Sequence, residues 1–223
     1  MGRDLTDRRP GHPAAGTPET LAQLLGGRRG AVDATLPAVA FAAGWLLADR
    51  SIAAGVVAAI GAGAVLAGWR VYRGGRSRAA VLGMCGVAVA SLVALRTGRA
   101  EDFFLLQMLS NVASALAWTS SILFRWPLLG VVVGTALGQR TRWRRDPALL
   151  HAYSAASWVW VAQYLLRLLV FVPLWYAGHV IPLTVARLAL SWPLVAVCLG
   201  ASWWVLRRSL PEDHPGLRHP RVG

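Results

Sequence analysis

The sequence predicts an all-α membrane protein, a polytopic bundle of about six transmembrane helices with one short re-entrant or interfacial half-helix. Two observations predict this class. Hydrophobic residues make up 56% of the 223 residues and charged residues only 15%, and the mean hydropathy is +0.48. The apolar residues also lie in long runs between short charged segments, whereas a soluble chain of this length carries more charge and shorter apolar runs.

The charge distribution predicts the orientation of these helices. All 23 basic residues are Arg, the formal net charge is +13, and 18 of the Arg fall in segments that we expect on the cytoplasmic side. This bias follows the positive-inside rule and argues against a nucleic-acid partner. It predicts a multi-pass plasma (inner) membrane protein with both termini in the cytoplasm. Anionic lipid headgroups on the cytoplasmic face are the expected partner, with membrane proteins as a second class.

The two ends of the chain differ in composition from its middle. Residues 1–30 are rich in Arg and Pro and predict a disordered cytoplasmic tail, with a short surface helix within it. Residues 31–208 form the predicted transmembrane helical domain, and residues 209–223 form a second disordered cytoplasmic tail.

Short polar segments separate the expected helices. The second span carries Gly55, Ala59 and Gly63 at every fourth position, which predicts a smooth face for close helix packing. The fourth span follows a charged outer loop at residues 96–102, and Asp146 with Pro147 predicts the cap before the fifth. In chain order the predicted spans are 34–48, 52–69, 79–95, 103–124, 153–177 and 180–206.

The segment at residues 127–138 is apolar but short. About ten residues cannot cross a hydrocarbon core of ~30 Å, and a crossing here would place the basic segment 139–147 outside. We therefore expect a re-entrant or interfacial half-helix, with Gly130, Gly134 and Gly138 along one face. Tryptophans gather near the expected inner interface, as an aromatic belt does: Trp69, Trp126, Trp143, Trp158, Trp160, Trp203 and Trp204.

Polar side chains at membrane depth are the best candidates for a functional site, because each is costly to keep there. Three of them, on spans four, five and six, lie roughly 12–15 Å below the outer ends of their spans. With neighbouring amides and two carboxylates, they predict an outward-opening pocket for an anionic group, since Arg binds carboxylate or phosphate with two parallel hydrogen bonds. The candidate residues are Glu101, Asp102, Gln107, Asn111, Gln163, Arg167 and Arg187.

A structural role is the interpretation that we favour for the two intramembrane arginines. Arg167 and Arg187 would then pair with Asp102, Glu101 or helix carbonyls and only dock the helices, or Arg187 would reach outer headgroups. No catalytic set, metal site or cofactor motif is apparent. His151 and His179, for example, fall on opposite sides of the membrane.

A family resemblance rests on several short motifs. They are Gly26-Gly-Arg-Arg-Gly-Ala-Val-Asp33 with Leu36-Pro37, Glu101-Asp-Phe-Phe with Asn111, Arg125-Trp-Pro-Leu, and Trp143-Arg-Arg-Asp146. Over residues 26–208 this pattern resembles the actinobacterial membrane proteins grouped as domain-of-unknown-function family 3159. The layout is more distantly similar to the bacterial intracellular septation protein A family, which is associated with envelope synthesis and division.

These resemblances favour an uncharacterised, non-enzymatic inner-membrane protein that supports the cell-envelope or division machinery. The alternative is a carrier or channel for a small anionic or polar solute, using a polar pocket between spans four, five and six.

Overall fold

The computed structural model describes residues 27–74, 77–138 and 141–211. Within these ranges the chain is all-helical, with no strand. The elements in chain order are α2 (Gly27–Leu47), α3 (Ile52–Tyr72), α4 (Ser77–Thr97), η1 (Ala100–Phe104), α5 (Leu105–Leu123), α6 (Leu128–Ala136), η2 (Arg142–Arg145), α7 (Pro147–Tyr176), α8 (Val180–Ala189) and α9 (Trp192–Ser209).

The first described helix begins earlier than predicted. Helix α2 starts at Gly27, so residues 27–30 are helical and do not belong to the predicted disordered tail. A glycine in a helix costs only about 1 kcal/mol relative to Ala. The later part of α2 is apolar and continues the same helix, which offsets this cost. The expected surface helix in residues 1–26 and the tail from residue 212 lie outside the described residues.

Three helical segments are long and apolar enough to cross a membrane: α3, α7, and α8 with α9 as one segment. The η1–α5 segment and α6 make a fourth only if they count together, and they are bent by 81°. The described apolar parts of α2 and α4, Thr35–Leu47 and Val81–Thr97, are shorter. Thirteen residues rise only about 20 Å. The described residues therefore support three or four spans, and the predicted six-span bundle is not confirmed.

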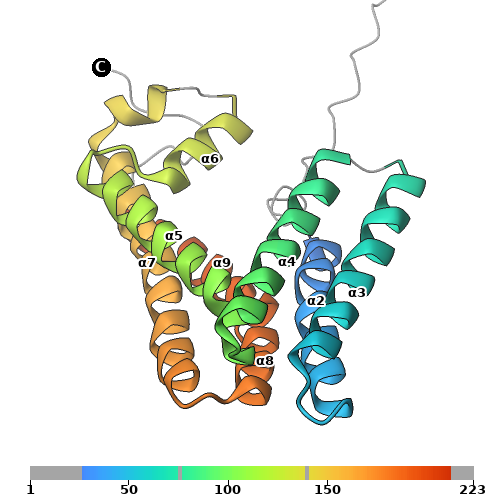
Figure 1. Ribbon diagram of the computed structural model, residues 1–223. Coiled ribbons are helices and arrows are strands. Elements are labelled where there is room, and N and C mark those ends of the chain that lie inside the picture. The colour runs from blue at the N-terminus through green and yellow to red at the C-terminus, as the bar shows by residue number, and fades with distance from the viewer. Residues whose placement is uncertain (1–26, 75–76, 139–140, 212–223) are drawn as a thin grey trace, which may run out of the picture.

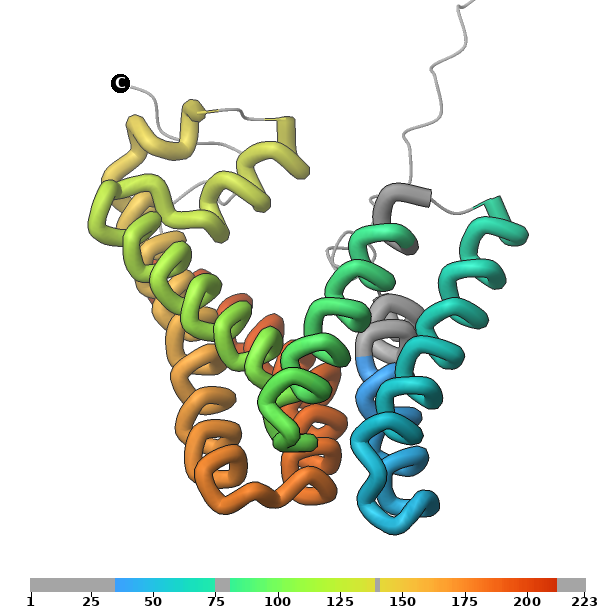
Figure 2. Tube along the Cα trace, in the orientation of Figure 1, coloured from blue at the N-terminus to red at the C-terminus, as the bar shows by residue number. Residues whose placement is uncertain are grey.

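The helices form two arms that meet at one end of the molecule (Figure 1). The first arm consists of α2, α3 and α4. The second consists of α5, α7 and α9, with α6 and η2 across its free end. Elements η1 and α8 lie where the arms meet, which we call the apex. The arms diverge toward the other end, where α3, α5 and α9 end and α7 begins (Figure 2). We call it the arginine-rich end, because several arginines lie at or next to these helix termini: Arg70, Arg73, Arg125, Arg144, Arg207 and Arg208.

Helices α2 and α3 pack at very close range. Gly55, Ala59 and Gly63 are all buried, which confirms the predicted packing face. A methyl group on Gly55 would lie 2.9 Å from the carbonyl oxygen of Phe41 on α2. Because that distance is shorter than an ordinary nonbonded contact, the two backbones approach this closely only over glycine.

The predicted tight turn between these two helices is also present. Asp49 and Arg50 both take positive φ, at 47° and 63°, and Ser51 then caps α3 by accepting a hydrogen bond from the Ala54 amide at 3.4 Å. Aspartate tolerates the left-handed region better than most residues, and the Ser51 hydroxyl satisfies an amide that the helix itself cannot.

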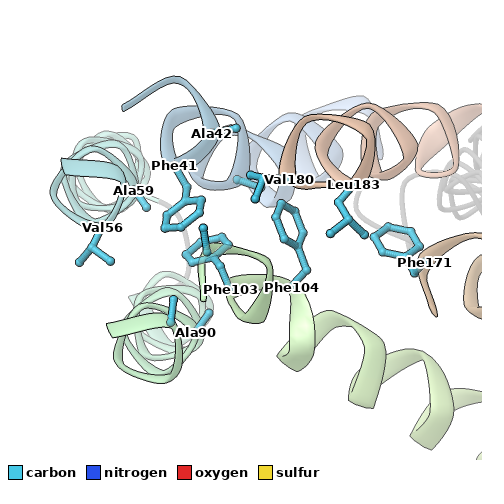
Figure 3. Packing of buried hydrophobic residues seen from close by; sticks show 13 residues of the cluster. Phe41, Ala42, Val56, Ala59, Ala90, Phe103, Phe104, Phe171, Val180 and Leu183 are labelled. Atoms are coloured by element: carbon cyan, nitrogen blue, oxygen red, sulfur yellow. The ribbon is translucent and has the colours of Figure 1, made fainter. Parts of the chain in front are cut away.

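An aromatic core joins the arms at the apex (Figure 3). Phe41 of α2 stacks on Phe103 of η1 with ring centroids 4.2 Å apart, and Phe103 meets Phe104 edge-on at 5.7 Å. Phe104 is fully buried and lies among side chains of α7 and α8, such as Phe171 and Leu183. The segment predicted as a charged outer loop is therefore in part a short 3-10 helix whose two phenylalanines hold the arms together.

A second core lies at the arginine-rich end. Short helix α6 is present where a half-helix was predicted, and it packs on Trp143 of η2 and on the first turns of α7. A methyl group on Gly130 would lie 2.8 Å from the Trp143 ring, which explains a glycine at this contact. Asp146 caps α7 as predicted, accepting hydrogen bonds from the Ala148 and Leu149 amides.

The predicted tryptophan belt is correct only in part. Trp143 and Trp160 are buried in the protein, at 1% and 6% exposure, and face other side chains instead of an interface. Four others each lie under a guanidinium at 4.0–5.2 Å from the ring centroid, and the pairs are Arg73 with Trp69, Arg144 with Trp126, Arg207 with Trp203, and Arg208 with Trp204. These Arg–Trp pairs are cation–π contacts at the arginine-rich end.

The last predicted span is broken in the middle. Helix α8 ends at Ala189 and α9 begins at Trp192, with Ser191 at ψ −94° between them. Pro193 occupies the first turn of α9, where proline starts a helix well, and it has no amide proton to donate to the Ala189 carbonyl one turn earlier. The span predicted over residues 180–206 is therefore one apolar segment long enough to cross a membrane, Val180–Ser209, with a break between α8 and α9 inside it.

Candidate functional site: a cavity between the arms

A cavity of about 320 Å³ lies between the two arms and is not sealed from its surroundings. We call it the interarm cavity. Its volume is at the lower end of the range for ligand sites, about 300–1,000 Å³. Elements of both arms and of the apex line it: α2, α3, α4, η1, α5 and α8.

Helix α4 forms one wall of the cavity. Gly83, Gly86, Val87 and Ala90 line it at a spacing of three and four residues, which places them on one face of the helix. A methyl group on Gly83 would have no neighbour within 4 Å. The small residues of α4 therefore leave room in this wall.

Two guanidiniums dominate the charge of the lining. Arg70 comes from α3 and Arg187 from α8, and both also interact with other groups of the protein. Gln107 and Ser110 of α5 add polar groups, and no carboxylate is among the lining residues that the structure describes. The remaining lining is apolar or glycine. Such a surface can hold an anion by charge-assisted hydrogen bonds in a region of low dielectric.

Behind the α5 wall, a second amide supports the first. Gln107 Nε2 donates to Asn111 Oδ1 at 3.4 Å. Asn111 is 1% exposed, and its Nδ2 has no hydrogen-bond partner in the described part of the chain. Asn111 therefore orients Gln107 from behind but does not itself line the cavity.

Glu101 and Asp102 form a separate cluster at the apex. Trp175 Nε1 donates to Asp102 Oδ1 at 2.8 Å, and Arg99 Nε donates to Glu101 Oε1 at 2.8 Å. The Arg99 guanidinium also lies 5.0 Å from the centroid of the Trp175 ring. The hydrogen bond from Arg99 to the Glu101 carboxylate raises the pKa of Arg99. These residues fasten η1 to α7, and neither carboxylate lines the cavity.

Gln163 and Arg167 belong to the packing of α7. Arg167 Nε donates to the carbonyl oxygen of Leu190 at 3.0 Å, a group that the break between α8 and α9 leaves without an intrahelical donor. Arg167 thus docks α7 on the broken helix, as the structural alternative for this residue predicted. Gln163 is 3% exposed, and its Oε1 has no partner among the described residues.

Comparison with known proteins gives one family. Residues 25–213 match the family described as "Protein of unknown function (DUF3159)". The chain belongs to this family. No curated protein and no solved structure matches it. The match confirms the predicted family membership, whereas an actinobacterial origin and the similarity to the septation proteins stay predictions. Every residue that lines the interarm cavity lies within the matched range.

The cavity is not where the predicted pocket was placed. Of the seven predicted site residues, only Gln107 and Arg187 line it, while the other five lie at the apex, behind α5 or within the packing of α7. The prediction missed the first arm entirely, above all Arg70 and Gly83. The spacing of Gly83, Gly86 and Ala90 was a visible signal for a smooth face, but it does not say which neighbour stands opposite.

The described residues contain no group of three or more His, Cys, Asp or Glu side chains that could hold a metal ion. Cys85 is exposed and Cys198 is buried, and both are free thiols. The polar side chains of the cavity lining can donate hydrogen bonds to an anion or to a polar solute.

Proposed function

We propose that this protein is a non-enzymatic integral membrane protein that binds and carries a small anionic or polar ligand in the interarm cavity. One observation carries the proposal: Arg70 and Arg187, from separate parts of the fold, line the same cavity, and the described lining includes no carboxylate. An Arg within a membrane domain is energetically costly and therefore rare, and such residues often mark a path for a ligand or an ion.

The geometry supports an anion over a cation. A guanidinium offers several donors in a planar fork and matches a carboxylate or a phosphate with two parallel hydrogen bonds. Gln107 and Ser110, on the opposite arm from Arg70, supply neutral hydrogen-bonding groups. A ligand bound there therefore touches both arms.

The position at which the arms are joined supports carriage in addition to binding. Their common core is at the apex (Figure 3), and the cavity lies between arms that diverge from it (Figure 1). Relative rocking of two helix groups around a site between them is a common transport motion. The broken helix α8–α9 is a further feature that transporters share.

In the proposed setting the arginine-rich end faces the cytoplasm, because basic residues are retained on that side of an inner membrane. The four Arg–Trp pairs at this end suit an anionic headgroup layer. A role in the cell envelope or in division remains a prediction from the distant resemblance, and no contact in the cavity favours it.

Binding measurements on purified protein in phosphatidylcholine nanodiscs test the proposal. Equilibrium dialysis with labelled inorganic phosphate and with labelled succinate should show saturable binding of at least one probe. Arg187→Gln should weaken it about tenfold, the loss of one charge-assisted contact of ~1.4 kcal/mol. Arg96→Gln is the matched control, since Arg96 is exposed and does not line the cavity.

Both variants must first show wild-type thermal unfolding, and Arg187→Lys should restore part of the affinity because it restores the charge. Equal affinity in the wild type and a folded Arg187→Gln would refute the site. Uptake of the bound probe into vesicles then distinguishes carriage from binding alone: vesicles that behave like empty ones refute carriage.

A further inference from the structure

We propose that the interarm cavity takes the phosphate headgroup of an anionic lipid, which enters sideways between α4 and α5 while its acyl chains stay in the bilayer. This inference rests on the proposed function and names the chemical class of its ligand.

The walls of the cavity are unlike those of a site for a freely soluble anion. Besides the two guanidiniums, the lining includes apolar side chains from three different helices, among them Leu66 of α3, Val87 of α4 and Leu106 of α5. An apolar lining with a few charged groups is what an amphiphile needs, because the chain attached to the charged group is apolar as well.

The volume decides which part of the lipid is inside. About 320 Å³ is enough for a compact headgroup but falls well short of two acyl chains, each of which adds buried methylenes that need a matching apolar surface. The chains must therefore lie outside the cavity, along its open side.

Apolar side chains are exposed on both helices that border this side. On α4, Val81 and Leu82 next to the lining residue Gly83 are 61% and 76% exposed. On α5, Leu109 next to the lining residue Ser110 is 64% exposed. Helices α4 and α5 connect through η1 at the apex and diverge away from it (Figure 2). The side chains beside the open edge of the cavity are therefore apolar, whereas the charged side chains of its lining are Arg70 and Arg187.

Charge complementarity selects an anionic phosphate lipid among bilayer components. A guanidinium has five N–H donors, so Arg70 or Arg187 can donate to a phosphate in addition to the interaction that each already makes within the protein. A zwitterionic headgroup instead brings its own cation to a lining whose two charged side chains, among the described residues, are both Arg. Basic pockets between transmembrane helices are a known mode of lipid headgroup recognition.

Native mass spectrometry of the detergent-purified full chain tests this proposal with three probes: dioleoyl phosphatidic acid, dioleoyl phosphatidylcholine and inorganic phosphate. We expect phosphatidic acid to bind at least about tenfold more tightly than phosphatidylcholine. Arg187→Gln should remove this preference.

An occluding variant tests the route without touching a charge. In Gly83→Leu the new side chain extends from the cavity-lining face of α4 into open space, so it should block the headgroup while the protein stays folded. Gly68→Leu is its matched control, because a methyl group on Gly68 also meets nothing within 4 Å and Gly68 does not line the cavity. We expect lipid retention to fall about tenfold in the first variant and to be unchanged in the second.

The outcomes separate the two proposals. Phosphate binding that depends on Arg187, without any preference for phosphatidic acid, overturns the lipid inference and leaves the anion site standing. Phosphatidic acid that binds equally well to Gly83→Leu and to the wild type also overturns it, because the lipid then lies on the outer surface. If no anionic probe binds in a manner that depends on Arg187, the proposed function fails with it.

Discussion

Three glycine-to-alanine substitutions on the single helix α3 should have three different effects on stability. At Gly55 the added methyl group would lie 2.9 Å from the Phe41 carbonyl oxygen and 3.1 Å from the Phe41 ring. At Gly63 it would meet the Met84 sulfur at 2.9 Å, and at Gly61 it would meet nothing within 4 Å. The chemical change is the same in each case, so only the surroundings differ.

The size of each stability change depends on whether the atom next to the added methyl group can move away. The Phe41 backbone is part of α2 and cannot shift alone, so Gly55→Ala must separate two helices and costs about 1–3 kcal/mol. The better helix propensity of alanine returns about 0.5–1 kcal/mol, which leaves a net loss of about 1 kcal/mol. The Met84 thioether is the far end of a flexible side chain and can turn away, so we expect Gly63→Ala to be near neutral. Gly61→Ala keeps the propensity gain and should stabilise.

Unfolding in mixed micelles with increasing SDS, followed by tryptophan fluorescence, measures this series. The expected order of stability is Gly61→Ala, then Gly63→Ala, then Gly55→Ala. If Gly55→Ala proves as stable as Gly61→Ala, then α2 and α3 do not approach each other as closely as described, and the packing argument for the first arm is wrong.

Three further substitutions probe the apex and the second arm by the same unfolding assay. Trp175→Phe removes the donor to the buried Asp102 carboxylate and should cost about 1.5–3 kcal/mol; a value near zero would mean that this bond does not fasten η1. Asp146→Ala removes the α7 cap and should cost about 0.5–2 kcal/mol, whereas Asp146→Asn should cost far less because it keeps an acceptor. Ser202→Ala leaves the buried Trp160 indole donor without its partner and should cost roughly 0.6–1.7 kcal/mol; Trp160→Phe should then cost less in the Ser202→Ala background than in the wild type, because the hydrogen bond is already gone, and equal costs in the two backgrounds would contradict this coupling.

The helical class and much of the local structure were predictable from the sequence. The small-residue face of α3, the turn at Asp49, the short helix after Arg125 and the cap at Asp146 each depend on contacts within a few residues or on one recurring spacing. The break after Ala189 could also be predicted, since Pro193 has no amide proton to donate to the Ala189 carbonyl and its ring clashes with that group.

The site was less predictable, because it depends on which helices stand opposite one another. Depth along each span singled out Arg187, but equal depth does not bring two residues together. Arg167 points to the Leu190 carbonyl instead, and the cavity is completed by Arg70 of the first arm. A hydropathy pattern contains no information on the angle between two arms, and that angle determines where space remains.

The location of the aromatic core has a mechanical consequence. The stacked pair of Phe41 and Phe103 lies at the apex. If one arm rotates about this point, its atoms are displaced little near the apex and much more at the far end. A 21-residue helix such as α3 is roughly 31 Å long, and turning it by about 10° displaces its distant tip by about 5 Å. A ligand that bridged Arg70 and Gln107, as proposed, would span this adjustable gap, and it would shift the opening angle only as far as its affinity differs between the wider and the narrower arrangement.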